Sequence, residues 1–215
     1  MTRTALVTGG TVRLGKVIAD RLRADGWRVL TSSHRADARA DLVADLADPL
    51  GAARLYAAAL EACGGTPPDA LVSNAALFVD GDAAAVRQVD FEAPRKLMTL
   101  MAGRETGVGA VVNILDSAAL GEANAADSPY LAAKRDLLDE TRRAAALFAA
   151  TLRVNGVAPG SVLAPVGVQM KAGERLLDRH PTASDVAAAV AYLLSAEAVT
   201  GAIIPVDSGQ HLLED

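Results

Sequence analysis

Short runs of consecutive apolar residues, each followed by a longer stretch with helical periodicity, constrain the fold of this chain most. The apolar runs lie at 4–8, 29–31, 70–73, 110–115, 152–157 and 203–206. The helical stretches lie at about 15–24, 49–62, 82–102, 129–150 and 183–195. Because the apolar runs do not alternate with polar residues, both faces of each strand should be buried. The pattern therefore predicts an α/β fold, with helices on both faces of a parallel sheet.

One connection departs from the regular order of strands and helices. Residues 36–48 contain a brief apolar element at 42–44 and are too few for a full crossover helix. We expect a turn or a short helix there, with residues 42–44 as a short additional strand.

Composition excludes several classes of protein. The 215 residues predict one domain, 1–215, and the net charge of -5 argues against a nucleic-acid-binding surface. The longest uncharged stretch, 154–170, is broken by prolines and glycines, which argues against a membrane span. The lone Cys63 excludes an intramolecular disulfide, and the early glycines argue against a signal peptide, so we expect a cytoplasmic protein. The histidines at 34, 180 and 211 lack metal-ligand spacing, and no metal is expected.

The turn from Thr8 to Gly15 predicts a phosphate-binding site. It lies between a strand and a helix, where glycines such as Gly9 let the backbone approach a pyrophosphate and the helix start offers N–H groups. Arg13 replaces the middle glycine of the usual spacing and is followed by Leu14. Its guanidinium could bind phosphate or reach an acidic or heteroaromatic substrate; a solvated surface arginine and a purely structural turn remain alternatives.

The end of the second strand favours NADP(H) over NAD(H). No carboxylate stands there to accept from the ribose hydroxyls, whereas Ser33, His34 and Arg35 could hold a 2′-phosphate. These residues could also form an ordinary polar loop. Asp45, at the end of the short third element, could accept from the adenine amine or could be a plain loop aspartate.

Tyr130 and Lys134 form a candidate catalytic pair. They stand four residues apart, so they are neighbours on one helix face. A nearby ammonium makes a phenol a better proton donor near neutral pH. Lys134 could also hold a ribose hydroxyl of the cofactor.

Together, these motifs resemble those of the short-chain dehydrogenase/reductase family over the whole chain. They are Thr8-Gly9, Asn74-Ala75, Tyr130 with Lys134, residues 153–160 and residues 206–209. The resemblance implies a doubly wound, Rossmann-like sheet of about seven parallel strands, a nicotinamide cofactor, a small-molecule substrate and a homotetramer or homodimer. It adds Leu46, Asn74, Ala75, Pro159 and Gly160 to the expected cofactor-binding residues.

Within the family, four features are similar to pteridine reductases. They are Arg13, the pair His34-Arg35, Phe78 after Asn74-Ala75, and Asp116 where most members have serine. The resemblance implies that Phe78 stacks a pterin ring, although it could equally fill the core. An ionised carboxylate can only accept hydrogen bonds, so Asp116 favours a substrate with N–H donors. Asp116 could instead cap the next segment.

The spacing before Tyr130 leaves the position of the serine open. Asp116 lies at the family's distance from Asn113, but Ser117 lies at the family's distance from Tyr130 and would give an ordinary reductase site. We favour Asp116.

Asp90 replaces the family's asparagine beside the lysine, which puts in question the supply of protons through Lys134. Residues 161–182 are expected to form a short substrate lid.

Three functions are consistent with these residues. The first is an NADPH-dependent reductase of a pterin-like heteroaromatic ring, with Arg13, Phe78, Asp116, Ser117 and Tyr130 at the substrate. The second is an NADPH-dependent carbonyl or 3-oxoacyl reductase that uses Ser117, Tyr130 and Lys134. The third is a non-enzymatic NADP-binding regulatory protein.

Overall fold

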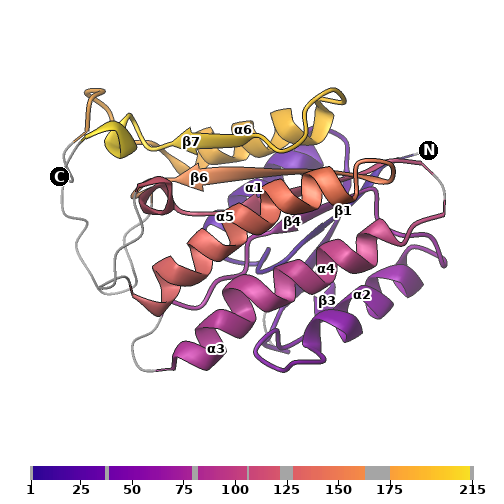
Figure 1. Ribbon diagram of the computed structural model, residues 1–215. Helices are drawn as coiled ribbons and strands as arrows, with labels where there is room; N and C mark the ends of the chain where they lie inside the picture. The colour runs from indigo at the N-terminus through magenta and orange to yellow at the C-terminus, as the bar shows by residue number, and fades with distance from the viewer. Residues whose placement is uncertain are drawn as a thin grey trace.

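A seven-stranded parallel sheet organises the chain (Figure 1). The computed structural model describes residues 2–36, 39–78, 82–105, 107–121, 128–162 and 175–213. The strands are β1 (Thr4–Val7), β2 (Arg28–Ser33), β3 (Leu42–Val43), β4 (Ala70–Ser73), β5 (Gly109–Ile114), β6 (Leu152–Pro159) and β7 (Ile203–Val206). Their order across the sheet is β3-β2-β1-β4-β5-β6-β7, which confirms the predicted Rossmann-like architecture. Because the order reverses beside β1, the loops after β1 and β4 meet at the same edge.

Helices cover both faces of the sheet (Figure 1). The longer helices are α1 (Arg13–Ala24), α2 (Gly51–Ala62), α4 (Ala93–Ala102), α5 (Pro129–Leu147) and α6 (Ala183–Ser195). Two short 3-10 helices are η2 (Ser117–Leu120) and η3 (Gln210–Leu212). Apolar residues of α2, α4 and α5 join one core, and those of α1 and α6 join the other.

Strand register explains why the apolar runs do not alternate. Leu71 pairs with Val111 and both belong to the core under α2, α4 and α5. The next pair, Val72 with Val112, belongs to the core under α1 and α6. Successive residues therefore enter two different cores, and apolar side chains are needed at every position.

The predicted helix at 82–102 is interrupted. The structure has α3 (Ala83–Arg87), a π-helical segment η1 (Gln88–Glu92) and then α4. A π turn holds one more residue than an α turn, so it changes which side chains face inward. Here Val89 and Asp90 are buried, and Asp90 lies in the middle of the segment.

The short connection after β2 has the form expected from the sequence. Among the described residues between β2 and β3 there is a turn at 36 and there are bends at 34 and 41, and none is helical. Asp41 supports this connection, because its Oδ2 accepts from the Thr31 amide at 2.8 Å and from the Thr31 hydroxyl at 2.7 Å. The helix predicted to end at 150 ends at Leu147. Most of the predicted lid, residues 163–174, lies outside the described residues.

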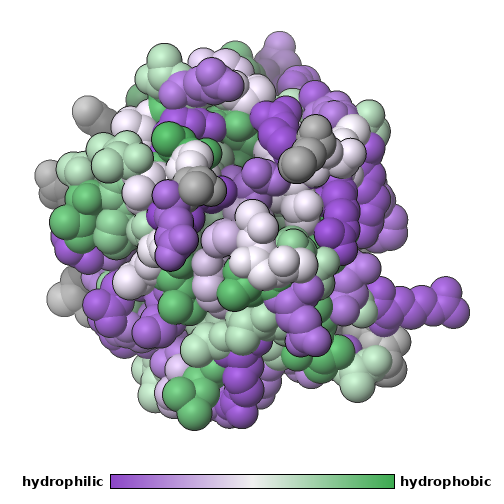
Figure 2. Space-filling model, turned by 90° about the vertical axis from the view of Figure 1, so that its right-hand side faces the viewer, coloured by the Kyte–Doolittle hydropathy of each residue, from purple (hydrophilic) through white to green (hydrophobic). Residues whose placement is uncertain are grey.

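The face beyond the amino ends of the strands carries a mixed surface (Figure 2). Hydrophilic side chains dominate this view, with smaller apolar groups between them. Among the described residues, no helix combines the length and apolar character needed to cross a bilayer.

Arg153 joins the sheet to the end of α6. From β6, its Nη1 donates to the carbonyls of Leu193 and Val199 and its Nη2 to that of Leu194, each at 3.0 Å. The carbonyls in the last turn of a helix lack partners within the helix. The planar guanidinium therefore satisfies three backbone acceptors from one strand position.

We predict that Arg153→Lys lowers the free energy of unfolding by about 1–3 kcal/mol, because an ammonium cannot reach all three carbonyls. Arg95→Lys is the matched control: Arg95 is exposed and bonds Glu92, so a change within about 0.5 kcal/mol is expected. Chemical denaturation of both variants measures the difference. Equal losses in the two variants would contradict this role of Arg153.

Candidate active site

The turn after β1 has the backbone geometry of an anion site. Gly9 has a φ of +62°, and a Cβ at Gly15 would lie 2.2 Å from the Gly9 carbonyl oxygen. Both positions therefore require glycine. Val12 precedes α1, and its side chain cannot accept a hydrogen bond from the first turn of the helix. The N–H groups at the start of α1 remain suited to bind a phosphate.

Arg13 has an unusual backbone conformation. It is the first residue of α1 and has a φ of +50°, in the left-handed region that favours glycine. This conformation costs a non-glycine residue roughly 1–2 kcal/mol. The exposed guanidinium thus stands at the start of α1, at a position where glycine would be less strained.

Hydrogen bonds join the loops after β1 and β4. Thr8 Oγ1 accepts from the amides of Asn74 at 2.9 Å and Ala75 at 3.0 Å. Asn74 Nδ2 donates to the Thr8 carbonyl at 2.9 Å. The sequence predicted cofactor roles for Asn74 and Ala75 but not that Thr8 would join the two loops. The available signal was a threonine between the strand and Gly9.

The residues at the ends of β2 and β3 lie at the same edge of the sheet. Ser33 Oγ accepts from the Arg35 amide at 3.0 Å, while His34 and Arg35 have exposed side chains. Beyond β3, Asp45 Oδ1 accepts from the Ala47 amide at 2.9 Å, and Leu46 is buried in the core. This bond from the Ala47 amide is the one that a loop aspartate makes.

Asp116 makes the contact at the Tyr130 hydroxyl. Tyr130 Oη donates to Asp116 Oδ2 at 3.1 Å, and Asp116 Oδ1 accepts from the Ala118 amide at 3.0 Å. One carboxylate therefore both caps η2, as the capping interpretation of Asp116 predicted, and faces Tyr130; its role toward a substrate stays a prediction. Ser117 is buried at the first position of η2, with 4% of its surface exposed.

The pKa of the Tyr130 hydroxyl is raised well above its usual range. Burial is the main cause, and the negative charges of Asp116 and Asp90 add to it. The phenol therefore stays protonated across neutral and moderately alkaline pH. A protonated phenol can donate a proton to a substrate.

Lys134 is buried behind Tyr130. Its Nζ donates to the Ile114 carbonyl at 3.1 Å and lies 3.0 Å from Asp90 Oδ1. The same Nζ is 5.4 Å from the centroid of the Tyr130 ring. Burial raises the pKa of Asp90, and the positive charge of Lys134 opposes that shift. The helix spacing thus brings Tyr130 and Lys134 together, as the sequence predicted.

Phe78 lies in the loop after β4 and does not fill the core. Its side chain is 69% exposed, and its ring meets that of Tyr130 edge to face, with centroids 4.9 Å apart and planes at 78°. An exposed aromatic ring beside the candidate acid is suited to contact a substrate.

The end of β6 completes the described part of the site. Pro159 pairs with Val206, and the Gly160 amide donates to the Val206 carbonyl at 3.0 Å. The lid predicted at 161–182 follows, largely outside the described residues. Among the residues that the structure describes, no group of histidine, cysteine and carboxylate side chains is arranged to hold a metal ion.

The candidate residues gather where the strands end. A candidate residue comes after each of four strands: Thr8 after β1, Asn74 after β4, Asp116 after β5 and Gly160 after β6. Helix α5 brings Tyr130 and Lys134 to the same edge. Ligands of open parallel sheets bind at this edge. The sequence did not predict two backbone contacts, because backbone groups leave no signal in residue types. The Ile114 carbonyl accepts from Lys134, and the Leu77 amide donates to Asp90 Oδ2 at 2.8 Å.

Known proteins share this fold and sequence pattern. The family described as enoyl-(acyl carrier protein) reductase matches residues 68–211. The 3-oxoacyl-[acyl-carrier-protein] reductase MabA of Mycobacterium bovis is 30% identical, and the alignment covers 99% of this chain and 94% of that protein. Galactitol 2-dehydrogenase (L-tagatose-forming) of Cereibacter sphaeroides is 32% identical, with 95% of this chain and 93% of that protein covered.

A solved structure has the same fold. The blue fluorescent protein from a metagenomic library, in complex with NADPH, superposes with a TM-score of 0.85 and 27% identity over 97% of each chain. The MabA alignment spans 243 positions, more than the 215 residues of this chain, so it includes positions at which this chain has no residue. With its parallel sheet, glycine turn and Tyr130–Lys134 pair, the chain belongs to the short-chain dehydrogenase/reductase family.

Proposed function

We propose that the protein is an NADP(H)-dependent reductase that transfers hydride to the carbonyl group of a 3-oxoacyl-type substrate. The observation that carries this proposal is the arrangement at Tyr130, whose protonated hydroxyl lies beside exposed Phe78 and in front of buried Lys134. Near-full-length similarity to a 3-oxoacyl-[acyl-carrier-protein] reductase supports the substrate class.

The residues present fit a dinucleotide phosphate. Glycine at positions 9 and 15 lets the turn pack closely against itself and against Asn74, which brings the backbone N–H groups at the start of α1 to this edge of the sheet. The start of α1 and Arg13 would bind the pyrophosphate, and Leu14 would line the same turn. Ser33, His34 and Arg35 would hold the 2′-phosphate. The remaining proposed contacts are Asp45, Leu46, Asn74, Ala75, Pro159 and Gly160.

The proposed mechanism assigns roles to Tyr130, Lys134 and Phe78. When bound, the reduced nicotinamide supplies the hydride. Tyr130 Oη would turn its proton from Asp116 to the substrate oxygen as negative charge develops there. The nearby Lys134 ammonium would stabilise the tyrosinate that remains. Lys134 would also donate to a ribose hydroxyl of the cofactor, and Phe78 would shield the reacting centre from water.

A pterin-like heteroaromatic ring is a second candidate substrate. The contact between Asp116 Oδ2 and Tyr130 Oη favours it, because it places a carboxylate where an N–H donor of such a ring could bind. The exposed Phe78 ring would stack on the flat substrate, and Arg13 and Ser117 would contact its edge. No relative described above is named as a pteridine reductase.

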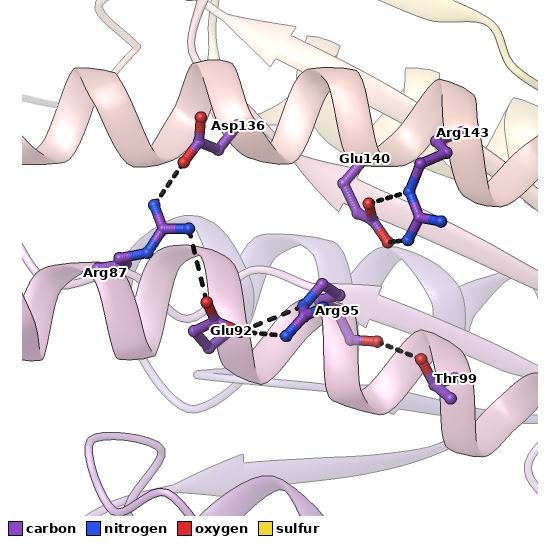
Figure 3. A network of polar contacts seen from close by, with 7 residues as sticks. All are labelled: Arg87, Glu92, Arg95, Thr99, Asp136, Glu140 and Arg143. Carbon is purple, nitrogen blue, oxygen red and sulfur yellow. Dashed lines mark hydrogen bonds and ion pairs between the residues drawn. The ribbon is translucent and has the colours of Figure 1, made fainter.

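Self-association as a homotetramer or homodimer stays a prediction. The family resemblance implies that the helix carrying Tyr130 and the helix after β4 pack between subunits. These elements, α5 and α3–α4, lie side by side on one face and are bridged by an Arg87–Asp136 ion pair (Figure 3).

We predict that Tyr130→Phe lowers kcat for reduction at least about a hundredfold, because general acid catalysis contributes about that much or more. The dissociation constant of NADPH should change little. Tyr192→Phe is the matched control, since Tyr192 is exposed on α6 and should leave both values unchanged. NADPH absorbance and fluorescence titration give the two readouts. Full activity in Tyr130→Phe would refute the assigned proton donor.

We predict that the parent protein reduces acetoacetyl-CoA more efficiently than dihydrobiopterin. Asp116→Asn separates the two substrate classes, because it keeps the oxygen that caps η2 and adds an N–H donor. Reduction of the carbonyl substrate should be retained or increased, whereas reduction of a pterin should fall at least about tenfold. Steady-state kcat/KM for both substrates is the measurement. A pterin preference that Asp116→Asn abolishes would favour the second candidate.

We predict that Arg35→Glu weakens NADPH binding at least about tenfold and leaves NADH binding within about twofold, because only NADPH carries the 2′-phosphate. Arg28→Glu makes the same charge change at the opposite end of β2, where the side chain is exposed and donates to the Ala62 carbonyl. It should affect neither cofactor. Equal losses of NADPH and NADH affinity in Arg35→Glu would contradict the assignment.

A further inference from the structure

Asp90 is the most deeply buried charged group near the candidate site. Its side chain is 0% exposed, and it lies in the π-helical segment η1 between α3 and α4. Its two carboxylate oxygens have different partners. Oδ1 lies 3.0 Å from Lys134 Nζ, and Oδ2 accepts from the Leu77 amide at 2.8 Å.

The partners of Asp90 belong to two separate parts of the site. Lys134 is on α5 behind Tyr130, whereas Leu77 precedes Phe78 in the loop after β4. The rings of Phe78 and Tyr130 are themselves in contact. These contacts therefore form a closed ring, and the Asp90 carboxylate joins its two halves. The members of the ring are Asp90, Lys134, Tyr130, Phe78 and Leu77.

We propose that Asp90 is a positioning residue that fixes Lys134 behind Tyr130, ties it to the loop carrying Phe78, and neutralises much of the charge of Lys134. This inference deepens the proposed reductase and rests on it only for the role given to Tyr130. With the charge of Lys134 offset, Tyr130 rests as a neutral phenol that can donate a proton. An uncompensated cation would instead favour the tyrosinate, which cannot.

The charged groups around Lys134 support this balance. Asp90 faces it from η1, and Asp116, which precedes η2, bonds the Tyr130 hydroxyl in front of it. The charged side chains of α3 and η1 that approach α5 pair on its outer side, where Arg87 meets Asp136 and Glu92 (Figure 3). On β6, Arg153 is engaged with the end of α6. Among the described residues, the Lys134 ammonium is thus accompanied by two carboxylates, those of Asp90 and Asp116.

Two carboxylates of the π segment face opposite sides. Asp90 and Glu92 are two residues apart in η1, yet Asp90 is buried and Glu92 bonds Arg95 on the outer side. The pair therefore offers a matched comparison of the same charge on the same segment, facing inward in one case and outward in the other.

The first test measures the titration of Tyr130 without any substrate. Absorbance near the tyrosinate band is followed from neutral to alkaline pH, and the corresponding Tyr130→Phe curve is subtracted. Asp116→Asn serves as the background, because neutralising the carboxylate bonded to Tyr130 brings its titration to lower pH. Adding Asp90→Asn should lower the pKa of Tyr130 by a further one to two units, about the effect of one nearby charge. Adding Glu92→Gln should leave it unchanged.

The second test measures the connection to the Phe78 loop. Hydrogen exchange of the Leu77 amide should stay slow in Asp90→Asn, whose amide oxygen can still accept from it. In Asp90→Leu the exchange should become at least about tenfold faster, as expected when a hydrogen bond to a charged group is lost. Asp90→Asn remains informative if Asp90→Leu does not fold.

Both readouts are independent of turnover. The same Tyr130 pKa with and without Asp90→Asn would overturn the charge balance, and unchanged Leu77 exchange in Asp90→Leu would overturn the tie to the loop. If Tyr130→Phe abolishes reduction but Asp90→Asn alters nothing, the reductase stands and this inference falls. If no substrate is reduced but both shifts occur, the inference stands and the proposed reaction falls.

Discussion

The buried ion pair between Lys134 and Asp90 is the interaction on which the geometry of the site depends. Taking two charges out of water costs several kcal/mol for each ion, and their attraction offsets this only when further hydrogen bonds satisfy both groups. Here Lys134 also donates to the Ile114 carbonyl, and Asp90 also accepts from the Leu77 amide. Four elements hold the pair in place, because β5, α5, η1 and the loop after β4 each provide one group. Removing a single partner would leave a charge unsatisfied in the core.

This dependence on several elements also limits what the sequence could predict. The parallel sheet was predictable, because apolar runs that lack alternation require burial on both faces. The Tyr130–Lys134 pair was predictable, because its geometry is set within one helix. The π segment was not, since the apolar residues at 82–102 have the spacing of an ordinary helix. The family resemblance had placed Asp90 beside Lys134, but residue types did not predict its contact with the Leu77 amide, which depends on how this segment packs against the loop after β4.

The ambiguity between Asp116 and Ser117 illustrates the same limit at a smaller scale. A single insertion moves a loop residue by one position, and residue counts cannot say on which side of the loop it occurred. The contact with the Tyr130 hydroxyl identifies Asp116 as the side chain that faces it. The resemblance to pteridine reductases rested on individual residues such as Asp116 and Phe78. The relatives over the whole chain include a 3-oxoacyl-[acyl-carrier-protein] reductase and a galactitol dehydrogenase, so these residues occur on a more general framework.

The charges around Tyr130 suggest why this framework suits reduction. A tyrosinate could accept a proton from an alcohol, but burial together with Asp116 and Asp90 opposes its formation. The hydroxyl is therefore ready to donate, and an oxygen or nitrogen that gains electron density from a hydride would receive its proton. In the proposed reaction the tyrosinate is the disfavoured form, and Lys134 is the nearby cation that would stabilise it. In the proposed charge balance Asp90 offsets part of that cation's charge, so the protonated phenol is the form that the site favours before and after the transfer.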